Sequence, residues 1–100
     1  MNKDFFIKQL DEIIADFLRI KSKAKYNDLS GNTSIEEITA LLSKSKAAIA
    51  RIVGNNSEYY KDIEATLKRT NIHAGNKLRY VMGTISALKS DLENDYLKSY

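Results

Sequence analysis

The chain has 100 residues, of which 43% are hydrophobic, and its 16 basic and 13 acidic residues give a net charge of +3. This composition supports one hydrophobic core and excludes a disordered tail, while so small a charge excess does not by itself indicate a nucleic-acid partner. The absence of cysteine excludes disulfides, thiolate metal sites and cysteine nucleophiles, and the absence of proline favours long helices. No apolar run is long enough to span a membrane and the first residues form no signal peptide, so we expect a cytoplasmic protein.

The first predicted helix covers residues 3–26. Its apolar residues recur at spacings of three and four, the pattern of one helix face: Phe6, Leu10, Ile13, Phe17, Ile20 and Ala24. Ile7, Ile14 and Leu18 lie beside this face and widen the apolar arc. A helix with so wide an arc contacts two neighbours within a bundle or presents part of the arc to another protein.

The second predicted helix covers residues 34–53 and follows a cluster of turn-forming residues at 27–32. Thr33 or Ser34 can form a capping box at its start, and Gly54 is placed for a left-handed cap at its end. Its expected core residues share a helical spacing: Ile35, Ile38, Leu41, Leu42, Ala48, Ile49, Ile52 and Val53.

Two further helices are predicted over residues 57–69 and 72–97. Ser57 is the expected N-cap of the short third helix, and Asn71 the expected N-cap of the fourth. The third buries Tyr60, Ile63 and Leu67, and the fourth buries one periodic set: Leu78, Val81, Met82, Ile85, Leu88 and Leu92.

The sequence therefore predicts one all-α domain over residues 1–100, an antiparallel up-and-down bundle of four helices with a short third helix. The fourth helix ends with Asp91, Glu93 and Asp95, whose negative charge is unfavourable at the C-terminal end of a helix dipole. We therefore expect the natural chain to continue beyond Tyr100, which makes this the N-terminal domain of a longer protein.

Catalytic chemistry has little support in the sequence. His73 is the single histidine and has no metal-ligating partner at helical spacing, and no glycine-rich phosphate loop occurs. Arg69 and His73 are similar to the arginine and histidine of HEPN ribonucleases, but fewer residues separate them here. We expect no enzymatic activity, no catalytic, metal or cofactor site, and no small-molecule ligand.

Two kinds of surface remain as candidates. Apolar contact with another protein is expected at Ile7, Ile14 and Leu18, with Tyr80 on the side of the fourth helix opposite its core residues. The alternative is phosphate neutralisation by a basic set on the first two helices: Arg19, Lys21, Lys23, Lys25, Lys44, Lys46 and Arg51. Small residues such as Gly83 indicate close approach of a helix, either within the bundle or from outside.

Three segments resemble an N-terminal helical module of uncharacterised bacterial proteins. They are the start around Phe5, Leu10 and Ile14, the run Ile52-Val53-Gly54-Asn55-Asn56-Ser57-Glu58-Tyr59-Tyr60, and the run from Gly83 to Leu97. In that family the module precedes a TIR-like or other effector domain of defence-type proteins, so the resemblance implies an accessory role. It also implies an exit into the following domain formed by Leu88, Asp91, Leu92, Tyr96 and Leu97, and we include Tyr96 and Leu97 in the expected interface.

These observations together predict a non-enzymatic module that associates with itself or with another protein domain and is accessory to a downstream effector. The alternative is a helical nucleic-acid-binding domain that uses the surfaces around Arg19–Lys25 and Lys44–Arg51. No membrane partner is expected.

Overall fold

A computed structural model describes residues 3–23 and 35–94 and has only α-helices as regular structure in these ranges. The four helices are α1 (Lys3–Lys23), α2 (Ile35–Val53), α3 (Glu58–Lys68) and α4 (Ala74–Glu93). The all-α fold and the short third helix agree with the sequence prediction. The expected caps at Thr33 and Ser34, and residues 24–26 and 95–97 of the predicted first and fourth helices, lie outside the described residues.

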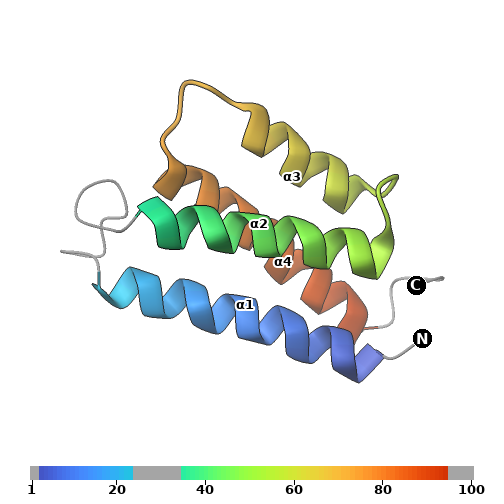
Figure 1. Ribbon diagram of the computed structural model, residues 1–100. Helices are drawn as coiled ribbons and strands as arrows, with labels where there is room; N and C mark the ends of the chain where they lie inside the picture. Colours follow the sequence, from blue (N-terminus) through green and yellow to red (C-terminus); the bar gives the residue numbers. More distant parts are fainter. Residues whose placement is uncertain (1–2, 24–34, 95–100) are drawn as a thin grey trace.

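Successive helices run in opposite directions, so α2 and α4 are parallel to each other (Figure 1). These two helices touch each other, and each also touches both α1 and α3. Within the described ranges α1 and α3 do not contact one another, so they lie on opposite sides of the α2–α4 pair. Because α4 has three neighbours, only one of its sides is left facing away from the bundle.

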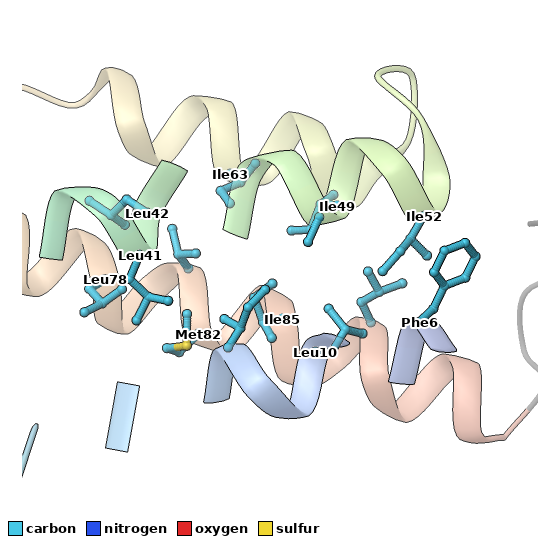
Figure 2. Close-up of a cluster of buried hydrophobic side chains, with 14 of the residues drawn as sticks. Phe6, Leu10, Leu41, Leu42, Ile49, Ile52, Ile63, Leu78, Met82 and Ile85 are labelled. Carbon is cyan, nitrogen blue, oxygen red and sulfur yellow. The ribbon is translucent and has the colours of Figure 1, made fainter. Parts of the chain in front are cut away.

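The core lies where the apolar faces of the helices meet. Figure 2 shows Leu10 of α1, Ile49 of α2 and Ile85 of α4 pointing into the same interior, and Ile63 of α3 extends it on the other side. All four side chains are at most 1% exposed. The periodic sets read from the sequence therefore account for this part of the core, because helical spacing translates directly into burial.

The turn between α2 and α3 forms as the sequence predicts. Gly54 has φ +83°, the left-handed conformation that glycine adopts without steric cost, and its N–H donates to the carbonyl of Ala50 at 2.9 Å. Ser57 is the N-cap of α3, because its Oγ accepts a hydrogen bond from the N–H of Tyr60 at 3.1 Å.

Three local expectations differ from the structure. Ile35, expected in the core, is the first residue of α2 and is 63% exposed. Ser45, which the apolar pattern left out, is fully buried and donates its hydroxyl to the carbonyl of Leu41 at 2.8 Å. At α4 the N-cap is His73 rather than Asn71, because the backbone stays extended through His73 (φ −84°, ψ 167°).

Across residues 3–23 and 35–94, no helix combines the length and the apolar composition needed to cross a lipid bilayer.

Candidate functional site

The apolar arc of α1 is divided between the core and the surface. Ile7 and Ile14 are half-buried and pack against the core, whereas Leu18 is 55% exposed. The reason is the position of α4 on this side of α1, where Lys89 Nζ lies 2.6 Å from Asp11 Oδ1. Of the three arc residues predicted for an interface, Leu18 is therefore the one that offers a largely exposed apolar side chain.

The residues on the side of α4 that faces away from the bundle follow a regular helical spacing. Its residues recur at spacings of three and four, opposite Leu78 and Ile85, and all but the half-buried Asn76 are exposed. We call them the outer face of α4: Asn76, Arg79, Tyr80, Gly83, Ser86, Ala87, Ser90 and Glu93. This spacing is the one that a helix uses to pack against another helix.

Gly83 lies at the middle of this outer face, and none of the residues in 3–23 and 35–94 packs on it. A Cβ atom built at this position has no heavy atom within 4 Å. A glycine inside a helix destabilises it by about 1 kcal/mol relative to alanine, and packing against the described residues does not explain this one. Of the two readings that the sequence left open for Gly83, close approach from outside the bundle is the one this geometry favours.

Tyr80 lies on the same face and is 55% exposed. The guanidinium carbon of Arg69, at the end of α3, lies 5.5 Å from the centre of the Tyr80 ring. Such a cation–π contact holds the ring in one orientation while leaving its other side open. The sequence identified the tyrosine, but it did not indicate that the turn from α3 to α4 brings Arg69 beside it.

Leu18 lies at the same level of the bundle as the centre of the outer face. It follows Asp11 by seven residues, and Met82 precedes Lys89 by seven residues on the antiparallel α4. At 1.5 Å per residue both lie about 10.5 Å from the ion pair that joins the helices. From this alignment we infer that Leu18 lies on the α1 side of the outer face of α4, near the level of Gly83, whereas Tyr80 lies on the α3 side of that face, beside Arg69.

The basic residues proposed for phosphate binding do not gather on one surface. Arg19 and Lys44 both lie near the Asp16 carboxylate, at 3.8 and 3.2 Å, and Lys23 lies 3.6 Å from Glu37. These acidic partners offset the positive charge between α1 and α2.

The rest of the basic set lies elsewhere. Lys46 faces α3, where its Nζ is 5.7 Å from the centre of the Tyr60 ring, and Lys25 lies outside the described residues. Lys21 is half-buried on α1, and Arg51 is exposed near the opposite end of the bundle. The described members of this set therefore form no continuous positively charged face.

A shallow groove of about 180 Å³ lies between α1 and α2. Asp16, Arg19, Glu37 and Lys44 form its rim over the apolar Ile20 and Leu41. Each carboxylate on this rim already has a basic partner from the chain, as described above. The groove offers a ligand few polar groups that are not already engaged within the protein.

Candidate metal ligands do not cluster in the described ranges. No group of three or more histidine, cysteine or carboxylate side chains could hold a metal ion there. The ring of His73 has the Asn76 amide 3.3 Å from its Nε2, on the surface at the start of α4. This arrangement is that of a solvated histidine at a helix start rather than of a catalytic base with an orienting carboxylate.

Tyr96 and Leu97, the other two residues expected in an interface, lie outside the described residues. Comparisons with protein-family models, with curated proteins and with solved structures find no match for this chain. The outer face of α4, bordered by Leu18, is therefore the candidate site on geometric grounds alone.

Proposed function

We propose that this chain is a non-enzymatic self-association module whose contact surface is the outer face of α4 together with Leu18 of α1. The observation that carries the proposal is the placement of two exposed apolar side chains, Leu18 and Tyr80, on either side of Gly83. A second helix can approach closely at the glycine and cover both side chains in the same contact.

Covering these two side chains favours association. About half of each of the two side chains is exposed, so covering one contributes roughly 1 kcal/mol to association. In a symmetric dimer each of these side chains occurs twice in the contact, so its contribution doubles. The rigid Tyr80 ring also loses little conformational freedom on binding. The accessory role implied by the family resemblance is consistent with this function, because a self-associating module positions whatever domain is attached to it.

Sedimentation equilibrium over a wide concentration range tests this proposal without assuming any ligand. We expect the wild-type chain to form a dimer or larger species and Leu18→Glu to shift the equilibrium to monomer. Ile35→Glu is the matched control, because Ile35 is at least as exposed, at 63%, but lies on α2. A wild-type chain that stays monomeric at every concentration would overturn the proposal, as would equal effects of the two variants.

A further inference from the structure

The third helix is attached to the bundle less extensively than the other three. It has 11 residues and buries one of them, Ile63, whereas α1, α2 and α4 bury four, seven and seven. Three more of its side chains, Tyr59, Tyr60 and Leu67, pack against the core but are only half-buried. A helix of this length is marginal in water on its own, so α3 stays helical only because this one face is packed.

The other three helices form a closed set without α3. Each of α1, α2 and α4 touches the other two, whereas α1 and α3 do not touch within the described ranges. Leu10, Ile49 and Ile85 belong to this set and point into one interior, and Ile63 reaches the core from the opposite side of the α2–α4 pair (Figure 2). Separation of α3 would therefore uncover one side of that pair and leave the contacts among the other helices in place.

The polar contacts that hold α3 against α4 lie at the two ends of the helix. At its start the Tyr59 hydroxyl donates to the Asp91 carboxylate, and at its end Lys77 Nζ donates to the carbonyl of Leu67 at 3.1 Å. Both hydrogen bonds are only partly buried. Water can replace such bonds when the helices separate, so each opposes separation weakly.

The two connections of α3 are suited to act as hinges. Gly54 precedes it with φ +83°, and the backbone after it is extended at Arg69 (ψ 135°) and again at His73 (ψ 167°). No residue of 54–57 or 69–73 is fully buried. A change of backbone angles in these two segments therefore costs few core contacts, which is what a hinge requires.

We infer that α3 is a lid that opens as a unit over the α2–α4 pair while α1, α2 and α4 stay folded. Opening removes Ile63 from the core and exposes the apolar side of the pair that α3 covers. It also withdraws Arg69, the C-cap of α3, from its place 5.5 Å from the centre of the Tyr80 ring. The outer face of α4 therefore changes with the state of the lid. The motion takes place within one chain and does not depend on self-association.

Amide hydrogen exchange followed by mass spectrometry tests the lid at a protein concentration low enough to keep the chain monomeric. Amides of α3 should exchange through the local opening, whereas the core amides of α2 and α4 exchange only through unfolding of the whole chain. We therefore expect the protection of α3 to be lower by at least about tenfold.

Two matched variants separate the local opening from global unfolding. Ile13 is completely buried and stays so when the lid opens, so Ile13→Val should lower the protection of the core amides about fivefold and leave that of α3 within about twofold of wild type. Ile63 is buried only while the lid is closed, so Ile63→Val should lower the protection of α3 and of the core amides alike.

Equal protection of α3, α2 and α4 in the wild-type chain would overturn the lid. An Ile13→Val variant that loses as much protection in α3 as in the core would overturn it too, because α3 would then open only when the whole chain unfolds. Neither result bears on self-association, which the ultracentrifuge measures separately.

Discussion

Lys89 Nζ lies 2.6 Å from Asp11 Oδ1 and joins the middle of α1 to the C-terminal half of α4. The hydrogen bond that Lys89 donates to the Asp11 carboxylate is the main cause that raises the pKa of Lys89 above its ordinary lysine value. Because the protonated lysine is favoured in the folded state, the contribution of this pair to stability is complete below the ordinary lysine pKa and is lost as the pH rises through the raised one.

We therefore expect Lys89→Met to lower the free energy of unfolding at neutral pH, and the difference from wild type to shrink at alkaline pH above the lysine range. Urea unfolding at the two pH values measures both differences. Lys61→Met is the control, because its pair with Glu58 spans 3.9 Å between side chains that are 59% and 88% exposed. A Lys89→Met difference that grows with pH would contradict the assignment.

The two glycines Gly83 and Gly54 should respond to alanine in opposite directions. At both positions a Cβ has no heavy atom within 4 Å, so steric contact does not distinguish them. Gly54 has φ +83°, where an alanine costs about 1–2 kcal/mol, whereas Gly83 is helical and its alanine should stabilise the monomer by about 0.5–1 kcal/mol. Chemical denaturation at low protein concentration measures both. Destabilisation by Gly83→Ala there would show that the glycine has a role within the monomer.

At high protein concentration Gly83→Ala has a second expected effect. The added methyl group keeps a second helix farther from the outer face of α4, so dimerisation should weaken even though the monomer is more stable. Sedimentation equilibrium measures this change. A variant that is more stable and dimerises as well as wild type would argue that a second helix does not approach closely at Gly83.

The fold was largely predictable because burial in a helix follows spacing. Leu10 and Ile85 belong to periodic sets and are completely buried, and the Ser57 cap and the left-handed Gly54 follow from the local chemistry of those residues. Ile35 was predicted to be buried because the spacing places it with Ile38, but spacing does not tell whether a neighbour extends as far as the helix end.

The candidate site was only partly predictable, because it depends on how the helices are rotated against each other. Leu18 and Tyr80 were recognisable as apolar residues outside the main stripes, but their common level beside Gly83 follows from the Asp11–Lys89 alignment. Likewise, the basic residues of α1 and α2 were visible, but their neutralisation by Asp16 depends on the 3.2 Å approach of Lys44 across the interface.

The two N-caps that the structure describes differ in whether the side chain makes a capping hydrogen bond. Substitutions at the two positions should therefore change the free energy of unfolding in opposite directions. Ser57 accepts from the Tyr60 N–H at 3.1 Å, so Ser57→Ala should lower the free energy of unfolding by about 1 kcal/mol. His73 makes no side-chain capping bond at α4, so His73→Ser should raise it by a few tenths to about 1 kcal/mol. Thermal unfolding of both variants checks these signs, and a destabilising His73→Ser would point to a structural role for the contact with Asn76.

Ile13 and Leu18 are aliphatic residues of the same helix with opposite environments. Ile13 is completely buried, so Ile13→Ala removes core contacts and leaves a cavity, which should cost about 2–5 kcal/mol of folding stability. Leu18 is 55% exposed, so Leu18→Ala should change the stability of the monomer by no more than about 0.5 kcal/mol. Urea unfolding at low concentration provides both values.

Protein concentration then separates folding from association. For Leu18→Ala the loss relative to wild type should grow as concentration rises, because only the wild type gains stability from the dimer. For Ile13→Ala the loss of stability should already be present at low concentration, where the dimer is absent, because it is a property of the monomer core. A loss for Leu18→Ala that is large at low concentration and independent of concentration would place this side chain in the core of the monomer and remove it from the proposed surface.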